Sequence, residues 1–230
     1  MILLAIDTST HLGSVAVVDG GRLLAEVSAR VRARHGETLL PHVQHVLAQA
    51  GVSPGELGLI AAGLGPGSFT GLRVGVATAK GLALALGVPI IGVCTLRVLA
   101  RGLGGHGTLA VPVVDAHKGE VFAAIYRTGD RLTEIVAPFH ASPARAAAHL
   151  RPALQAGGPV LTCGDGARRY AAELATAFGE EAMAAEVFDA PRAALLAVEA
   201  LQQMATHGPS DLRALEPMYV PPNDAALRGG

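Results

Sequence analysis

The chain has 230 residues, of which half are apolar, only 3% are aromatic and 16% are charged, and its formal net charge is −1. This composition argues against broad disorder, and the near-neutral charge gives no sign of a protein that binds nucleic acid by itself. The apolar start meets Asp7 at once and has no basic flank. We therefore expect a cytoplasmic protein without a signal peptide or a membrane segment, in which Cys94 and Cys163 are free thiols.

Hydrophobic periodicity and turn residues divide the first hundred residues into short strands and helices. Asp19-Gly20-Gly21 predicts a hairpin turn between the second and third strands. The expected elements are strands over 2–7, 14–18 and 22–28, a helix over 37–50, a strand over 57–64, a helix over 74–86, a strand over 89–93 and a helix over 95–103.

A second set of elements follows a glycine-rich linker at 104–107 and repeats the first set. The run 111–115 resembles 3–7, and each of these apolar runs ends in an aspartate. The elements expected after it are strands over 119–125 and 131–136, a helix over 142–154, a strand over 159–163, and helices over 167–178 and 191–205.

This repetition predicts an α/β fold made of two β-β-β-α-β-α halves. The same layout is that of the actin, Hsp70 and sugar-kinase (ASKHA) architecture, in which two acidic first hairpins face each other across a nucleotide cleft. We assign the first half to 1–103 and a degenerate second half to 104–230. The last helix, at about 191–205, could pack back on the first half.

The segment 65–75 is the most informative stretch, because it joins a predicted strand to a predicted helix through several glycines. Backbone N–H groups at such a turn bind anions, although no Gly-Lys-Ser/Thr follows as in a P-loop. A row of small residues at every fourth position would also let a second helix approach closely. That row is Gly71, Gly75, Ala79, Ala83 and Gly87. The segment is therefore either a ligand loop or a helix-packing surface.

Three polar turns could face a nucleotide, the first two its phosphate or a bound Mg²⁺ and the third its adenosine or ribose. They are the turn 7–10 after the first strand, the mirrored turn at Asp115, and 164–165 between a strand and a helix. Equally, the first turn could bond to its own backbone, and Asp165 could cap its helix. The candidate phosphate-facing residues are Asp7, Thr8, Ser9, Gly65, Gly67, Asp115, Gly164 and Asp165.

We predict no catalytic residue and no metal site from the residues themselves. The histidines within 35–45 favour a solvated or partner-facing helix side, because a metal site needs more ligands and the chain has neither a His-Glu-x-x-His nor a His-x-x-x-His motif. Nor does any nucleophile have a credible base. The alternating Arg30, Arg32 and Arg34 favour a charged edge strand, with an acidic or RNA partner as the alternative.

Four blocks of sequence occur together in this chain. They are Ile-Asp-Thr-Ser at 6–9, His-Gly-Glu-Thr-Leu-Leu-Pro at 35–41, a segment at 65–83 that begins Gly-Pro-Gly-Ser-Phe-Thr-Gly-Leu-Arg, and Asp-Ala-His-Lys-Gly-Glu-Val at 115–121. Together they resemble the bacterial TsaB (YeaZ) family, over most of the chain but weakly after about residue 132. The resemblance implies a role in making N6-threonylcarbamoyladenosine in tRNA.

The resemblance further implies an accessory subunit and not an enzyme. Such a subunit pairs with the transferase TsaD and the ATPase TsaE, forms a homodimer when alone, meets tRNA only through the complex, and binds at most weak ATP or ADP beside its partner. The catalytic paralogue carries a His-x-x-x-His metal pair, and Thr95 and Leu99 stand at those positions here. The alternatives are an autonomous kinase or metallopeptidase-like hydrolase of the same fold and a stand-alone RNA-binding module.

The family also implies a pairing surface made by the first two helices. We expect the small-residue row and the apolar positions of these helices to supply it. The expected interface residues are Leu39, His42, Val43, Val46, Leu72, Gly75, Val76, Ala79 and Leu82.

Overall fold

The computed structural model describes residues 1–31, 35–155 and 157–220. Arg32, Arg34, the side chain of His35 and the tail from 221 lie outside the described residues. The chain divides into two compact units, Met1–Val98 with Pro191–Met218, and Leu99–Ala190 with Tyr219–Gly230. The boundary therefore falls before residue 99 and not after 103, and 191–218 belongs to the first unit.

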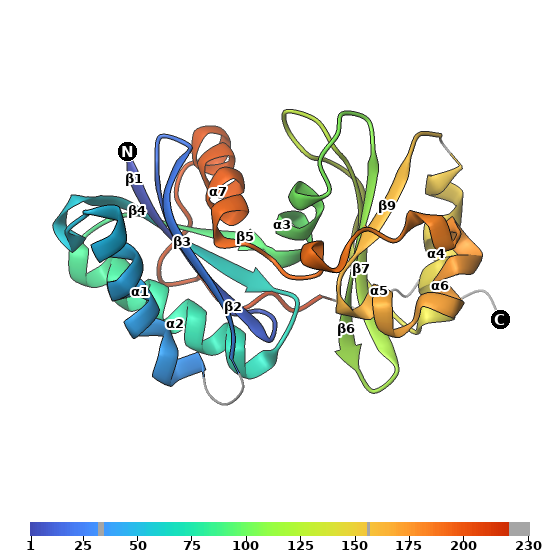
Figure 1. The fold of residues 1–230 in the computed structure, drawn as a ribbon, viewed down its shortest axis with the longest axis horizontal. Coiled ribbons are helices and arrows are strands. Elements are labelled where there is room, and N and C mark those ends of the chain that lie inside the picture. The colour runs from blue at the N-terminus through green and yellow to red at the C-terminus, as the bar shows by residue number, and fades with distance from the viewer. Residues whose placement is uncertain (32–34, 156, 221–230) are drawn as a thin grey trace. The chain divides into compact units, whose positions relative to one another are not determined.

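The first unit is built on a five-stranded sheet in the order β3-β2-β1-β4-β5 (Figure 1). The first three strands pair antiparallel through tight turns, and β4 and β5 run parallel to β1. The strands are β1 (Ile2–Asp7), β2 (Leu12–Asp19), β3 (Arg22–Arg30), β4 (Leu57–Gly65) and β5 (Ile90–Cys94). The helical elements are α1 (His35–Ala50), η1 (Pro54–Glu56), α2 (Phe69–Leu86) and α7 (Ala193–His207), and the boundary between the units falls within α3 (Thr95–Gly102).

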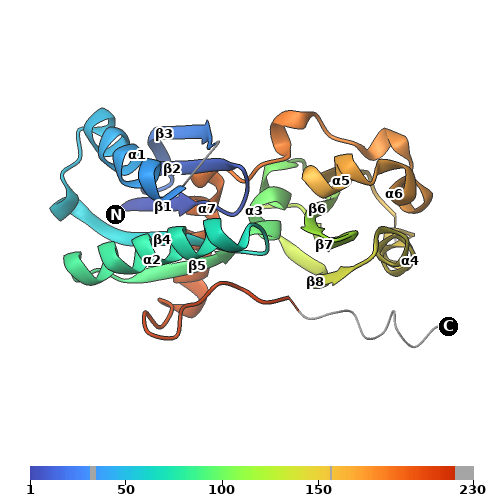
Figure 2. The ribbon, with the colours of Figure 1, turned by 90° about the horizontal axis from the view of Figure 1, so that it is seen from below.

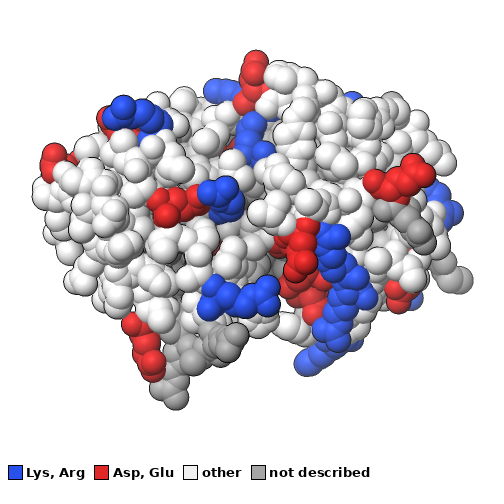
Figure 3. Space-filling view, in the orientation of Figure 1, with Lys and Arg blue, Asp and Glu red and all other residues white. Residues whose placement is uncertain are grey.

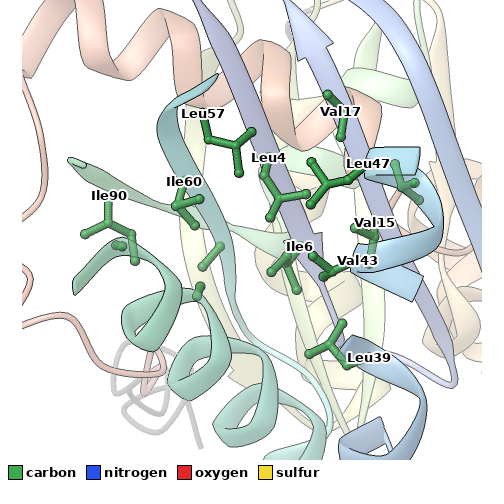
Figure 4. Close-up of a cluster of buried hydrophobic side chains, with 14 of the residues drawn as sticks. Leu4, Ile6, Val15, Val17, Leu39, Val43, Leu47, Leu57, Ile60 and Ile90 are labelled. Carbon is green, nitrogen blue, oxygen red and sulfur yellow. The ribbon is translucent and has the colours of Figure 1, made fainter. Parts of the chain in front are cut away.

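Helices cover both faces of this sheet, because each central strand buries its side chains in both directions. Helices α1 and α2 lie beside each other on one face, and α7 packs on the opposite face against β1, β2 and β5 (Figure 2). Figure 4 shows the cluster under α1. Its labelled members include Leu39, Val43 and Leu47 on the helix, and Leu4, Ile6 and Val15 on the strands.

The second unit repeats this plan with a four-stranded sheet in the order β8-β7-β6-β9. Strands β6 to β8 are antiparallel neighbours, and β9 runs parallel to β6 as β4 does to β1. The strands are β6 (Leu109–His117), β7 (Glu120–Arg127), β8 (Thr133–Ala141) and β9 (Val160–Cys163). The helical elements are α4 (Pro143–Leu154), α5 (Asp165–Arg169), α6 (Ala171–Phe178), η2 (Glu180–Ala182) and η3 (Glu186–Phe188).

The predicted α/β duplication is confirmed, with two differences in the helices. Helix α2 begins at Phe69 and not at 74, because Ser68 caps it by accepting a hydrogen bond from the Gly71 N–H at 3.3 Å. The single helix expected over 167–178 is two helices, since the backbone leaves helical geometry at Tyr170.

Helix α2 is also long and apolar enough to cross a membrane by length and composition alone. One such helix is weak evidence for a membrane protein. In this structure its inner face, with Ala79 and Ala83, packs into the cluster of the first sheet.

The N-terminus of α7 is capped by side chains of the sheet on which it packs. The Ala193 N–H donates to Ser14 Oγ at 2.9 Å, and the Ala194 N–H donates to Glu26 Oε1 at 3.0 Å. Arg192 bonds to the other oxygen of Glu26, whose side chain is only 5% exposed. The first N–H groups of a helix have no partner within the helix, and these bonds supply acceptors for two of them. Because the acceptors belong to β2 and β3, the same bonds hold α7 to these strands.

The segment after α7 covers the free edge of β5 (Figure 2). The Ser210 N–H donates to the Ile90 carbonyl at 2.9 Å, and the Lys80 ammonium of α2 donates to the Leu215 carbonyl at 2.9 Å. Leu215 is buried in the cluster beneath α2. Residues 208–218 are therefore part of the first unit and not an appendage of the second.

Removing the Glu26 carboxylate should destabilise the first unit. We expect Glu26→Ala to lower the free energy of unfolding by roughly 1–3 kcal/mol, because the Ala194 N–H loses its acceptor inside the protein. Glu26→Gln should cost less, since its amide oxygen can still accept. Urea unfolding with Glu216→Ala, an exposed acid of the same unit, as control measures this. Equal losses for Glu26→Ala and the control would contradict the capping role.

Candidate functional site

The polar turn after β1 is bonded to the turn that starts α2. The Ser68 N–H donates to the Ser9 carbonyl at 2.7 Å, and Thr8 Oγ1 donates to the Gly71 carbonyl at 2.7 Å. Asp7 Oδ1 accepts from the Ser9 N–H at 2.9 Å and from Ser9 Oγ at 2.6 Å. The two turns thus use each other's donors and acceptors, and we call this arrangement the β1–α2 junction.

The glycines of the junction are needed for close backbone approach. A Cβ at Gly67 would lie 2.1 Å from the Ser9 carbonyl oxygen, and one at Gly75 would lie 2.1 Å from Thr8 Oγ1. Gly65 has φ 97°, a left-handed conformation that favours glycine. These contacts explain the glycine pattern of 65–75 through packing within one unit.

The first group of predicted phosphate-facing residues lies largely inside the first unit. Asp7, Thr8 and Ser9 are at most 1% exposed, and Gly65 is buried. Gly67 is partly exposed, but it lies against Ser9. The structure brings all five residues together, and the Thr8 and Ser9 hydroxyl groups are bonded to Gly71 and Asp7 of the same unit.

The second group of candidates forms a bonded cluster in the second unit. The Asp115 N–H donates to Asp165 Oδ1 at 2.9 Å, and Arg169 Nη1 donates to Asp115 Oδ2 at 2.7 Å. That bond raises the pKa of Arg169. A Cβ at Gly164 would lie 2.1 Å from the Val113 carbonyl oxygen, so this turn also packs tightly on β6.

Asp165 is the first residue of α5, and Gly164 holds the N-cap position. The Gly164 N–H at the start of that helix donates to Asp189 Oδ1 at 2.8 Å, and Arg168 pairs with the same carboxylate. Neither Asp189 nor Arg169 is a candidate from the sequence. Both act on turns more than fifteen residues away, and no local pattern reveals such a pairing.

Most of the predicted interface residues are core residues of the first unit. Leu39, Val43, Val46, Leu72, Val76 and Ala79 are at most 4% exposed, Leu82 and His42 are half-buried, and Gly75 faces Thr8. The small-residue row therefore packs inside its own unit. The physical reason is that helical periodicity identifies faces but does not say which face is inward, and α2 has small residues on both.

The opposite faces of these two helices are exposed. On α2 the side chain of Phe69 is 55% exposed and that of Leu84 is 73% exposed, and the Arg73 guanidinium stacks on the Phe69 ring at 3.8 Å. We call the following set the outer α1–α2 face. It consists of Leu40 and Gln44 of α1, and Phe69, Arg73, Ala77, Gly81 and Leu84 of α2.

Known proteins are similar to this chain in sequence and in fold. Residues 24–225 match the family model of TsaD, described as tRNA N6-adenosine threonylcarbamoyltransferase. The structure superimposes on YeaZ from Pseudomonas aeruginosa with a TM-score of 0.80 and 28% identity, covering 95% of this chain and 99% of that one. The chain belongs to the family that this TsaD model describes, and it shares its fold with YeaZ.

Two curated relatives carry the name tRNA threonylcarbamoyladenosine biosynthesis protein TsaB. The Escherichia coli protein is 41% identical over 129 residues, which is 55% of this chain and 55% of that protein. The Bacillus subtilis protein is 35% identical over 138 residues, 60% of each. The matched stretch thus spans little more than half the length of these relatives.

A further solved structure agrees with the same fold. A Pseudomonas aeruginosa protein described as similar to peptidase YEAZ has a TM-score of 0.85 and 29% identity over 95% of this chain. Among the described residues, no three His, Cys, Asp or Glu side chains are grouped so that they could hold a metal ion.

The Gly75 contact predicts opposite effects for two glycines of one helix. Gly75→Ala should destabilise the protein by roughly 1–3 kcal/mol, because the new methyl group meets Thr8. Gly81→Ala meets nothing within 4 Å and should be neutral or stabilising by about 0.5–1 kcal/mol. Thermal unfolding of both, with Gly75→Ala also made in a Thr8→Ala background to relieve the contact, checks this. A stable Gly75→Ala variant would refute the packing account.

Asp7 predicts a pH-dependent stability. Burial raises the pKa of Asp7 from 3.8 to about 6, against the opposing effect of its two bonds from Ser9. The folded state therefore holds the proton more tightly than the unfolded chain. This stabilisation, on the order of 3 kcal/mol, is complete below about pH 4 and is lost as the pH rises through about 6.

The test compares urea unfolding between pH 4 and 7 for the parent protein, Asp7→Asn, and Asp130→Asn, whose carboxylate is 97% exposed. Asp7→Asn should flatten the pH profile of the unfolding free energy, whereas Asp130→Asn should leave it unchanged. A parent-like slope in Asp7→Asn would show that another group is responsible.

Proposed function

We propose that this chain is a non-catalytic, cytoplasmic subunit for N6-threonylcarbamoyladenosine formation in tRNA, which pairs with a TsaD-type transferase subunit and a TsaE-type ATPase. The names of its curated relatives support the pathway. The observation that carries the accessory role is the environment of Thr95 and Leu99, which stand where the catalytic paralogue has its two metal-binding histidines.

Both positions lie in the packed interior of this protein. Thr95 is fully buried and Leu99 is 2% exposed. A leucine side chain offers no ligand atom, and a threonine hydroxyl is a poor ligand for a transition metal. The β1–α2 junction adds to this, because it occupies the hydroxyls that a phosphate site would need. A catalytic role for the chain alone therefore has no support at these positions.

The outer α1–α2 face is the surface that we assign to the partner. Its exposed apolar side chains, Leu40, Phe69 and Leu84, are of the kind that protein interfaces bury. Ala77 and Gly81 would let a helix of the partner approach closely. A specific interface here would bury on the order of 1,200–2,000 Å² in total. The same face would mediate a homodimer when the partner is absent.

Contact with tRNA is assigned to the complex and not to this chain. Among the described residues on the face drawn in Figure 3, Lys and Arg lie in separate groups, several of them beside Asp or Glu. The formal net charge of −1 agrees with this. Nucleic acids are bound through many phosphate contacts, which need a concentration of positive charge.

Reconstitution with purified components tests the proposal. The chain alone should neither hydrolyse ATP nor modify tRNA, and adding it to a TsaD-type subunit, a TsaE-type ATPase and threonylcarbamoyl-adenylate should give modified tRNA. ATP hydrolysis by the chain alone that is lost in Asp7→Ala would favour an autonomous enzyme instead.

A bulky residue on the outer α1–α2 face should weaken pairing without unfolding the chain. We expect Ala77→Trp to reduce association in analytical ultracentrifugation by about tenfold or more, and to reduce tRNA modification in parallel. Ala172→Trp, at an exposed position of α6, is the matched control and should change neither. Ala79→Trp should unfold the protein, since Ala79 is fully buried. Unchanged association of a folded Ala77→Trp variant would place the interface elsewhere.

A further inference from the structure

Two buried side-chain oxygens in the described part of the chain have no hydrogen-bond partner among protein atoms. They are Asp7 Oδ2 and Thr95 Oγ1. Both side chains are fully buried. A carboxyl or hydroxyl oxygen left unpaired inside a protein costs free energy, so such atoms normally have a partner.

Strand register places the two residues at the same end of the first sheet. Ile6 pairs with Ala62, so Asp7 lies beside Gly63 of β4, and Gly63 pairs in turn with Val93 of β5. Thr95 follows Val93 by two residues, where β5 leads into α3. Asp7 thus ends β1 on one side of β4, and Thr95 follows the end of β5 on the other side.

The side chains of this row point to the face that α7 covers. Leu3 and Ala5 of β1 and Val93 of β5 all pack in the cluster with α7. Asp7 continues the alternation of Leu3 and Ala5, because side chains two apart on a strand share a face. Its position over Gly63 agrees, since a Cβ there would lie 3.4 Å from Leu196 of α7.

Gly63 is the residue that leaves room for the Asp7 carboxyl group above β4. A Cβ at Gly63 would lie 2.1 Å from Asp7 Oδ2. The Asp7 carboxyl therefore occupies the space that a side chain of β4 would fill, and it is directed across β4 toward β5. Leu196 closes this space from the helix side, so bulk solvent does not reach it.

We propose that Asp7 Oδ2 and Thr95 Oγ1 share one internal water molecule above Gly63 and beneath α7. A water molecule offers two donors and two acceptors, so it can pair with a carboxyl oxygen and with a hydroxyl group at once. Bridging waters of this kind are common where buried polar groups do not reach each other. The water would let an apolar helix close over a carboxyl group without leaving that group unpaired.

A double-mutant cycle tests whether the two side chains act through a shared partner. Asp7→Asn, Thr95→Val and the double variant are unfolded in urea. Each variant changes the unfolding equilibrium constant by some factor relative to the parent protein. The factor of the double variant should differ from the product of the two single-variant factors by about threefold or more. The control cycle combines Asp7→Asn with Thr108→Val, a buried threonine of the second unit, and should agree with the product within about twofold.

If Asp7→Asn does not fold, carbon-13 NMR titration of the Asp7 carboxyl group tests the shared water molecule instead, by comparing the pKa of Asp7 between the parent protein and Thr95 variants. Thr95→Val should raise the pKa of Asp7 further, because the ionised carboxylate loses a polar neighbour. Thr95→Ser keeps the hydroxyl group and should keep the parent pKa. An additive cycle, an unchanged pKa in Thr95→Val, or a high-resolution crystal structure without a water bonded to both oxygens would overturn the proposal.

Discussion

The hydrogen bond from Thr8 Oγ1 to the Gly71 carbonyl is the interaction on which the architecture of the candidate site depends. It joins the end of β1 to the first turn of α2, and the bond from the Ser68 N–H to the Ser9 carbonyl lies beside it. The approach requires a residue without a side chain at Gly75. A strand-to-helix turn of this composition suits an anion in general, but here the neighbouring strand of the same unit supplies the groups that an anion would otherwise contact.

Helix α7 packs on the opposite face of the sheet, and side chains of the sheet hold its N-terminus in place. Ser14 and Glu26 cap its first N–H groups, Leu196 lies over Gly63, and Glu199 is buried in an ion pair with Arg97 of α3. A buried carboxylate is costly unless it is paired. The packing of Glu199 in the interior therefore depends on its ion pair with Arg97. The junction and α7 thus enclose Asp7 between them, which accounts for its raised pKa.

The fold could be predicted from the sequence because its signals are local. Alternating apolar residues, the Asp19-Gly20-Gly21 turn and the repeated aspartates at 7 and 115 give the strands and the duplication. The site could not, because its decisive contacts join residues far apart in sequence, as Thr8 and Gly71 are. Glu26 offered one signal, a carboxylate in the middle of a strand between Ala25 and Val27, which indicates a bonded partner. The sequence held no such signal for the exposed face of α2. Ala77 and Gly81 repeat with the same spacing as Gly75 and Ala79, so spacing does not distinguish the exposed face from the buried one.

The central claim is that the β1–α2 junction is a packed joint in which the Thr8 and Ser9 hydroxyl groups and the Ser68 N–H are already bonded, and that the chain contributes a surface instead of a nucleotide site. Calorimetric titration of the purified chain with Mg-ATP tests it most directly. The account predicts no saturable heat for the chain alone. Saturable binding that disappears in both Thr8→Ala and Ser9→Ala, with the fold retained, would show that the junction opens to a phosphate and would contradict the account.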